Sequence, residues 1–401
     1  MKNQNKFKIA ILGLGAAGSV IVRFLQRDKE IERIICFVRN AKKAKEFLPD
    51  GMRKIILKEI DAVKNKGRFS KEIKGLDLII NAASSRINLE ILNACYKAGV
   101  NYLDLASQHL HHPFKIEQFE FVKKFKEKRL KGLICAGIAP GISNLMIRKL
   151  ADEFDSIDDI KLRLAENTIS QDIISSWSPD LAIEELSEKV PVYRNGRFLS
   201  KEPFSEEELC EYPKPFGKMS TTLICQDEQL TIPLFIKTKN IDAKSGGNDI
   251  EIMKLFYRLG FFSEKTKTIS GNKIKLKDLL EKILPPTPSP KEMASIIKKG
   301  RIQEARFGIL VEMQGRKNNR ELIKKEWLIC PSIFEIQKKM PGATYISYPT
   351  GLAAYLFAKY LLKRDFKGII PPEGLPEKEG LQILKIFKKI SHPNEHFYTQ
   401  T

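Results

Sequence analysis

Three glycines near the start of the chain have the spacing of a turn that binds a dinucleotide. Gly13, Gly15 and Gly18 form the pattern G-x-G-x-x-G, directly after an apolar run and before an amphipathic one. The first glycine permits a tight turn, the second lets the backbone approach a pyrophosphate, and the third allows close packing of helix on strand. The first turn of that helix offers free N–H groups to the phosphates. The predicted phosphate-binding residues are Gly13, Gly15, Ala16, Ala17 and Gly18.

The end of the next apolar strand, residues 31–38, bears on the choice of dinucleotide. A site specific for NAD normally has Asp or Glu about 20 residues beyond the glycines, where it binds the ribose 2′-hydroxyl. This chain has Arg39 and Asn40 there, followed by Lys42 and Lys43. Because Arg can bind a 2′-phosphate with two hydrogen bonds, the pattern favours NADP. NAD stays possible, since Arg39 could instead stack on the adenine or face the solvent.

Alternating strand and helix patterns must position these residues. Strand-like runs at 76–81, 99–106 and 132–137 are separated by helical patterns, of which 89–98 is the clearest. Strands that alternate with helices at this spacing are typical of a doubly wound parallel sheet. The sequence therefore predicts an α/β protein with an N-terminal Rossmann domain.

Ligands of such sheets bind beyond the carboxyl ends of the strands. The residues predicted to line the cofactor there are Asn81, Ala82, Ala83, Ala106 and Gly137. Asp104, at the end of a predicted strand, and the nearby His109 are the candidate acid and base groups. For Asp104 the alternative is hydrogen bonding to loop amides, and for His109 it is a surface position without a role. His111 and His112 follow, but no fourth ligand has a suitable spacing, so no metal is expected.

A Gly-Pro-rich loop precedes the helix predicted at 145–154. Pro140, Gly141 and Asn144 could hold a substrate carboxylate or the nicotinamide amide at the start of that helix. The alternative for the polar residue is helix capping alone.

The composition limits the possible partners. The 401 residues include 69 Lys and Arg against 49 Asp and Glu, a formal net charge of +20. The basic stretches also contain acids and lack interleaved aromatic residues, so nucleic-acid binding is not expected. No apolar run is long enough to span a membrane, and no signal peptide is recognisable, which predicts a cytoplasmic protein. The six cysteines are scattered, without the spacing of a zinc site.

Motifs along nearly the whole chain resemble the saccharopine dehydrogenase (saccharopine reductase) family, whose lysine 6-dehydrogenase and carboxynorspermidine synthase branches are similar. The segments that carry the resemblance are 13–18, 39–40, 102–105, 137–141, 176–179, 192–196, 306–315, 326–330, 348–351 and 368–373.

The resemblance implies two domains and a reaction. Residues 1–142, rejoined by 346–401, would form the NAD(P)-binding domain, and 143–345 an α/β domain with a mixed sheet for substrate binding and dimerisation. The protein would transfer hydride between NADP(H) and a carbon bonded to nitrogen in an amino-acid-type substrate such as saccharopine. A lysine 6-dehydrogenase-like or carboxynorspermidine synthase-like enzyme is the alternative. A catalytically silent nucleotide-binding regulatory protein is an alternative of another class.

One segment departs from the family pattern. An Arg-Tyr-Pro-Gly-His-like motif is replaced here by residues 243–248, in which Asn248 stands where His is expected. Lys244 could bind a carboxylate as a point charge, and Arg86 could supply the missing clamp. Trp177 is a candidate for lining the substrate pocket, with core packing as the alternative. His392 and His396 lie in a polar tail without an assigned role.

Overall fold

The computed structural model describes residues 6–49, 51–391 and 399–400. The chain divides into two compact units, Met1–Leu145 with Ser347–Pro393 and Met146–Ile346 with Asn394–Thr401. The first boundary lies three residues beyond the predicted position of 142. Among the described residues, every helix is too short or too polar to cross a membrane.

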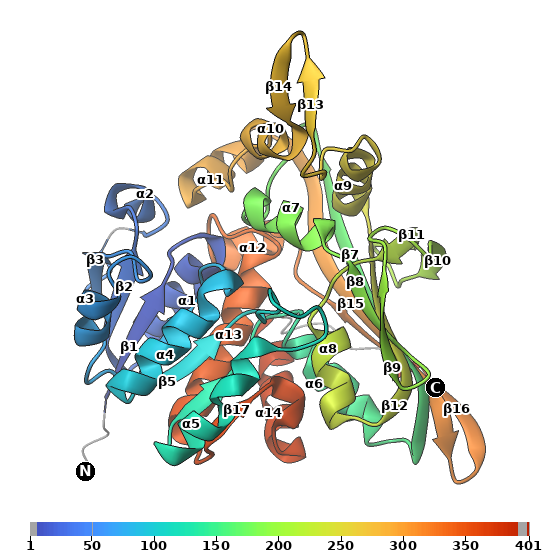
Figure 1. Cartoon of the computed structure of the whole chain (residues 1–401), viewed down its shortest axis with the longest axis horizontal. Coiled ribbons are helices and arrows are strands. Elements are labelled where there is room, and N and C mark those ends of the chain that lie inside the picture. Colours follow the sequence, from blue (N-terminus) through green and yellow to red (C-terminus); the bar gives the residue numbers. More distant parts are fainter. Residues whose placement is uncertain (1–5, 50, 392–398, 401) are drawn as a thin grey trace. The chain divides into compact units, whose positions relative to one another are not determined.

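The first unit contains a seven-stranded sheet in which all strands are parallel (Figure 1). The strand order is β17-β6-β5-β4-β1-β2-β3, so the direction of winding reverses between β1 and β4. The strands are β1 (Phe7–Leu12), β2 (Ile31–Val38), β3 (Ile55–Glu59), β4 (Leu78–Asn81), β5 (Asn101–Asp104), β6 (Lys131–Leu133) and β17 (Gly368–Ile370). This confirms the predicted doubly wound sheet, whose ligand crevice lies at such a reversal.

Helices complete the first unit because its central strands are apolar on both faces. The helices are α1 (Ala16–Arg27), α2 (Ala41–Lys45), α3 (Lys66–Glu72), α4 (Asn88–Ala98), α5 (Val122–Glu127), α13 (Ser347–Lys363) and α14 (Glu377–Ser391), and α6 (Ile142–Ala151) contains the unit boundary. Helix α13 packs on α1, where Phe24 stacks on Tyr355 with ring centroids 5.5 Å apart. Gly351 permits this approach, because a Cβ there would lie 2.4 Å from Val20 Cγ1.

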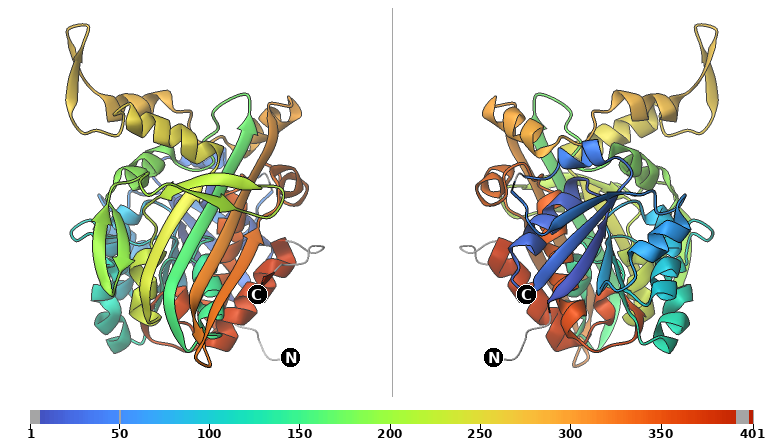
Figure 2. Two further views of the ribbon diagram at one scale, coloured as in Figure 1. Left: turned by 90° about the vertical axis from the view of Figure 1, so that its right-hand side faces the viewer. Right: turned by 90° about the vertical axis from the view of Figure 1, so that its left-hand side faces the viewer.

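The second unit is built on a nine-stranded mixed sheet, as predicted (Figure 2). Its strands are β7 (Ser156–Ser170), β8 (Val190–Arg194), β9 (Arg197–Lys201), β10 (Glu208–Glu211), β11 (Lys218–Leu223), β12 (Thr238–Gly246), β15 (Ile302–Lys317), β16 (Arg320–Ile329) and β18 (Thr399–Gln400). Strand β7 pairs in parallel with β12 and antiparallel with β15. The order is β10-β11-β12-β7-β15-β16-β18, with β8 beside β12 and β9 beside β8.

Six helices and a separate hairpin of β13 (Thr266–Ile269) and β14 (Asn272–Lys275) belong to the described part of the second unit. These helices are α7 (Pro179–Ser187), α8 (Glu228–Phe235), α9 (Asn248–Arg258), α10 (Leu276–Ile283), α11 (Pro290–Lys298) and α12 (Ile333–Lys339). The proline-rich segment 285–289 is a loop inside this unit, and Pro290 already belongs to α11. It ends at Ser289, which forms a capping box with Glu292 at the start of α11.

The end of the chain corrects one prediction. The sequence assigned all of 346–401 to the nucleotide-binding domain, but Thr399–Gln400 pairs with β16 in the second unit. Without this pairing, β16 would present unpaired N–H and C=O groups, which bind any extended segment regardless of its side chains. A polar tail therefore carries no sequence signal for such pairing. His392 and His396 lie outside the described residues.

Candidate functional site

The glycine turn after β1 has the geometry expected for phosphate binding. Gly13 has a φ of +89°, and a Cβ at Gly18 would lie 2.2 Å from the Gly13 carbonyl oxygen. Gly15 is exposed, and a Cβ there would have no atom within 4 Å. Among residues 6–49, 51–391 and 399–400, no side chain caps the first turn of α1. The open space above these uncapped N–H groups fits a pyrophosphate.

The end of β2 offers a cation for the ribose end of the dinucleotide. Arg39 is exposed and forms no hydrogen bond or ion pair within the described part of the chain, although it attracts the carboxylate of Asp61 electrostatically. Asn40 Oδ1 accepts the N–H of Lys43 at 2.9 Å and so caps α2. The N–H of Ala41 donates to Glu59 Oε2 at 2.8 Å. The loop is thus held by its neighbours, which leaves the Arg39 guanidinium available to a 2′-phosphate.

A buried amide network fixes the loops beyond β4 and β5. Asn81 Nδ2 donates to Asn88 Oδ1 at 2.7 Å, and Asn88 Nδ2 donates to the Ala106 carbonyl at 2.8 Å. The N–H of Ala83 donates to Asn81 Oδ1 at 3.1 Å, and the Tyr102 hydroxyl donates to Asn88 Oδ1 at 2.9 Å. The sequence analysis missed Asn88, although a polar residue between Ile87 and Leu89 was the available signal.

Asp104 has the environment of a structural carboxylate. It is buried at the end of β5, where its Oδ1 accepts the Cys135 N–H at 2.8 Å and its Oδ2 accepts Gln118 Nε2 at 3.0 Å. Both oxygens are therefore held by fixed donors, which favours the loop-amide alternative over proton transfer. His109 is half-buried, with its Nδ1 3.3 Å from Ser107 Oγ.

The loop before α6 is braced from within. The Gly137 N–H donates to the Pro140 carbonyl at 2.8 Å, and a Cβ at Gly141 would lie 1.9 Å from the Gly137 carbonyl oxygen. Asn144 Oδ1 accepts the Gly141 N–H at 2.7 Å, and its Nδ2 donates to Glu373 Oε2 at 3.0 Å. Asn144 is fully buried. Its side chain therefore holds the loop, which favours the capping alternative over a direct contact with substrate.

Arg86 lies in a short 3-10 turn, Ser85–Ile87, that follows the loop at Ala83. It is exposed, and its N–H donates to Ser84 Oγ at 3.3 Å. The turn starts four residues after the end of β4, so Arg86 is near the predicted cofactor edge of the sheet. Its role as a carboxylate clamp stays a prediction.

The second unit contains a cavity of about 600 Å³. Its lining includes the end of β7, the loop that contains Trp177, and the first turns of α7 and α9. Trp177 is half-buried there. Asn248 also lines the cavity but is exposed, and its amide donates to the Thr168 carbonyl at 3.2 Å. Gly247 makes the sharp turn from β12 into α9, because a Cβ there would lie 2.2 Å from the Glu166 carbonyl oxygen.

Five acids line this cavity, and two of them, Glu166 and Asp249, have a raised pKa. Glu166 Oε1 accepts the Ser245 hydroxyl at 2.9 Å. Asp249 Oδ2 accepts the Thr168 hydroxyl at 2.8 Å and also the Tyr345 hydroxyl. Burial raises the pKa of Glu166 to about 7 and that of Asp249 to about 6. The sequence analysis missed both acids, because neither belongs to a local motif.

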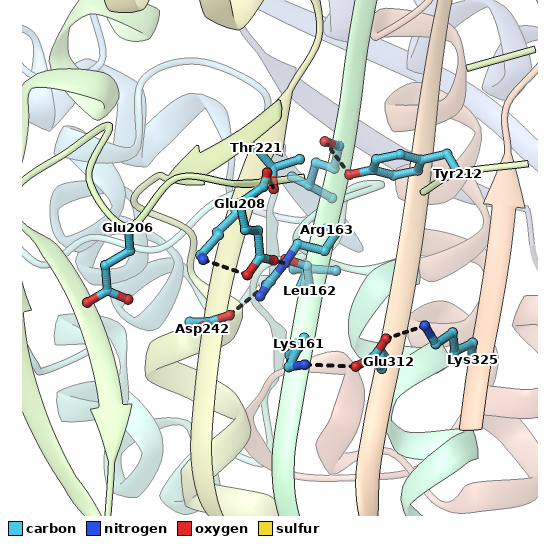
Figure 3. A network of polar contacts seen from close by, with 12 residues as sticks. Lys161, Leu162, Arg163, Glu206, Glu208, Tyr212, Thr221, Asp242, Glu312 and Lys325 are labelled. Atoms are coloured by element: carbon cyan, nitrogen blue, oxygen red, sulfur yellow. Dashed lines mark hydrogen bonds and ion pairs between the residues drawn. The ribbon is translucent and has the colours of Figure 1, made fainter. Parts of the chain in front are cut away.

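Lys244 does not line the cavity. Successive side chains of a strand face opposite sides, and on β12 it is Ser245 that faces Glu166. Lys244 Nζ instead lies 2.9 Å from Glu208 Oε2. Figure 3 shows the network that it joins, in which the buried Arg163 contacts both Glu208 and Asp242. The substrate-binding role predicted for Lys244 is not supported by this position.

Comparisons with known proteins relate these features to a family. A family model described as the saccharopine dehydrogenase NADP binding domain matches residues 9–131. A carboxyaminopropylagmatine dehydrogenase of Synechocystis sp. is 26% identical over 231 residues, which are 55% of this chain and 57% of that protein. A carboxynorspermidine synthase of Vibrio cholerae is 25% identical over 61% of this chain and 62% of its own length. A carboxynorspermidine synthase of Vibrio alginolyticus is 24% identical over 85% of this chain and 83% of its own length. The chain thus matches about three fifths of the first two relatives.

Solved structures share the fold of both units. Apo saccharopine dehydrogenase (L-Glu forming) from Saccharomyces cerevisiae aligns over 98% of this chain and 99% of its own, with a TM-score of 0.69 and 11% identity. A homospermidine synthase from Legionella pneumophila, in complex with NAD, aligns over 99% of this chain and 93% of its own, with a TM-score of 0.66 and 12% identity. Residues 9–131 therefore match the model of the saccharopine dehydrogenase NADP binding domain, and the chain shares its fold with saccharopine dehydrogenase.

Proposed function

We propose that the protein is an NADP(H)-dependent oxidoreductase that transfers hydride to or from a carbon bonded to nitrogen in an amino-acid-type substrate. The observation that carries the proposal is the pairing of an uncapped glycine turn with Arg39 at the next strand end. The family match over residues 9–131 and the dehydrogenase named among the relatives support it.

Each part of the first unit has a proposed task toward the cofactor. The N–H groups after Gly15 bind the pyrophosphate, and Arg39 binds the 2′-phosphate. Ala83, Ala106 and Gly137 line the nicotinamide end, at the carboxyl ends of β4, β5 and β6. Bound there, the nicotinamide supplies or accepts the hydride.

Other residues of this unit act as positioning residues in the proposal. Asn81 and Asn88 keep the loops after β4 and β5 at fixed positions, and Asp104 does the same for the backbone at Cys135. Such fixed loops would align the nicotinamide with the reacting carbon, which is the main contribution that a protein makes to hydride transfer.

The proposal includes a cytoplasmic location and a homodimer formed through the second unit. The location is supported by the cysteines, which are all free thiols in the fold. The dimer rests on the family resemblance alone. Light scattering on the purified chain tests it, because a mass of 45.8 kDa would be that of a monomer and would overturn the dimer.

A titration of the purified chain with NADPH and with NADH tests the cofactor assignment. Nicotinamide fluorescence reports binding, and NADPH is expected to bind at least tenfold more tightly than NADH. Equal affinities for NADPH and NADH would show that Arg39 does not bind the 2′-phosphate. Absence of binding by either nucleotide would overturn the proposed function.

A further inference from the structure

Two residues of opposite charge follow neighbouring strands at the nucleotide edge of the first unit. Arg39 comes directly after β2, and Asp61 comes two residues after the end of β3. The two strands pair in parallel with Val38 opposite Glu59, and the Ile60 N–H donates to the Val38 carbonyl at 2.9 Å. Because paired strands are about 4.8 Å apart and both end at this edge, Arg39 and Asp61 belong to one small region of it.

The Asp61 carboxylate is held by its own turn. Its Oδ1 accepts the N–H of Val63 at 3.0 Å and that of Lys64 at 2.9 Å. This is an Asx turn, in which a side-chain oxygen takes the place of a backbone carbonyl. These N–H groups, that of Lys64 first, hold the pKa of the carboxyl below its ordinary value, and the positive charges of Lys64 and Arg39 add to the effect. The side chain is therefore a fixed negative charge at neutral pH.

This arrangement attracts the Arg39 guanidinium without occupying it. Arg39 forms no ion pair within the described residues, although Asp61 carries the opposite charge nearby. Moving the carboxylate to close such a pair would break the two N–H bonds that hold it. The guanidinium donors therefore stay available to a ligand, but under the attraction of a fixed acid.

The edge as a whole remains cationic. Its segments 39–43 and 59–64 hold four cations and two acids, namely Arg39, Lys42, Lys43 and Lys64 against Glu59 and Asp61. Glu59 Oε2 accepts the Ala41 N–H at 2.8 Å, so this acid braces the loop at the start of α2. The excess of positive charge attracts an anion, and Asp61 is the acid that opposes this attraction at Arg39.

A fixed acid near the arginine has a different effect on each dinucleotide. To bind a 2′-phosphate, the Arg39 guanidinium must give up part of its attraction to Asp61. NADH has a hydroxyl group in place of that phosphate and does not compete for the guanidinium. The charge of Asp61 thus acts against NADPH alone, in the way that a repulsive group sets specificity.

We propose that Asp61 sets the dinucleotide specificity of this site, because its fixed carboxylate competes with the 2′-phosphate for Arg39 and narrows the preference for NADPH over NADH. The inference rests on the proposed function, in which Arg39 binds that phosphate. Asp61 is a positioning residue in this account, since it acts on the phosphate through Arg39.

A titration of the full chain with NADPH and with NADH, followed by nicotinamide fluorescence at low and at high salt, tests the proposal. Asp61→Asn removes the charge but keeps an oxygen that accepts the N–H groups of Val63 and Lys64. At low salt it should bind NADPH at least about threefold more tightly than the wild type, and NADH within about twofold. The gain for NADPH should shrink at high salt, because salt screens exposed charges.

Asp77→Asn is the matched control, because Asp77 also accepts a backbone N–H, that of Lys8 at 2.7 Å, but precedes β4 at the opposite edge of the sheet. It should bind both nucleotides like the wild type. If Asp61→Asn fails to fold by circular dichroism, Asp61→Ser keeps a smaller acceptor in the turn and should show the same gain. In the Arg39→Ala background, Asp61→Asn should change the affinity for NADPH less than about twofold.

The outcomes separate this inference from the proposed function. An unchanged or weaker affinity for NADPH in folded Asp61→Asn would overturn the role of Asp61. An equal gain for NADPH and NADH, or a gain that persists in the Arg39→Ala background, would do the same. If Arg39→Ala weakens NADPH binding and Asp61→Asn has no effect, only this inference falls and the nucleotide site stands. If the wild type binds neither nucleotide, the proposed function and this inference fall together.

Discussion

Replacing Arg39 with alanine should separate the two dinucleotides. Arg39 is exposed directly after β2 and makes no hydrogen bond or ion pair within the described residues, so besides a ligand contact the substitution removes only its electrostatic attraction to Asp61. A charge-assisted hydrogen bond contributes about 1.5–3 kcal/mol. NADPH should therefore bind about 10- to 150-fold more weakly to Arg39→Ala. NADH lacks the 2′-phosphate, and its affinity should change less than about twofold.

The assay is a nicotinamide fluorescence titration of three proteins with both nucleotides. Arg33→Ala is the matched control, because Arg33 is an exposed arginine of the same strand β2 but lies far from its carboxyl end. It should bind both nucleotides like the wild type. The reasoning is refuted if Arg39→Ala leaves the affinity for NADPH unchanged, or weakens NADPH and NADH by the same factor.

Three further predictions concern stability. Gly141→Ala should lower the unfolding free energy by about 3 kcal/mol or more, because its Cβ would lie 1.9 Å from a carbonyl oxygen. The control is Gly217→Ala, at φ +70° in open space, which should lower the unfolding free energy by about 1–2 kcal/mol. Thermal unfolding of the two variants measures the difference. Asp242→Ala should cost about 3–5 kcal/mol in urea unfolding, since it leaves the buried Arg163 without one of its two acidic partners, and a loss below about 1 kcal/mol would contradict this. The pKa of Glu166 is about 7 in the fold against 4.5 ordinarily, so its contribution to stability is complete below pH 4.5 and is lost as the pH rises through about 7. The Glu166→Gln variant should therefore lose less stability than the wild type as the pH rises from about 5 to about 8, which thermal unfolding measures. Parallel plots of stability against pH for the two proteins would contradict the raised pKa of Glu166.

The nucleotide-binding unit was largely predictable because its signals are local. The glycines, the apolar strands and Arg39 lie within short segments, and parallel strands with right-handed connections leave few alternative topologies. Burial at strand ends is not a local property. The sequence placed Asp104 correctly at the end of β5, but the donors that occupy its carboxylate, Gln118 and Cys135, come from later segments.

The second unit shows where sequence reasoning fails. Glu166 and Asp249 are 83 residues apart, and the pairing of β7 with β12 brings them to one cavity. A lone acid in a strand has no signature of its own. Lys244 was assigned from its position in a family motif, but strand register decides which side chain faces the cavity. On β12, Lys244 therefore faces Glu208, whereas the next residue, Ser245, faces Glu166.

The most direct test of the proposed function follows NADPH absorbance in the presence of the purified chain, an amino acid with a free amine such as lysine and an oxo acid such as 2-oxoglutarate. We predict that NADPH is oxidised when both organic reactants are present and not when either is omitted, because hydride goes to the carbon of the imine that they form. The reverse reaction, reduction of NADP+ by the secondary amine product, should also be measurable. If NADPH binds tightly but is not consumed with these reactants, and NADP+ is not reduced with saccharopine or lysine, the chain is a nucleotide-binding protein without this activity.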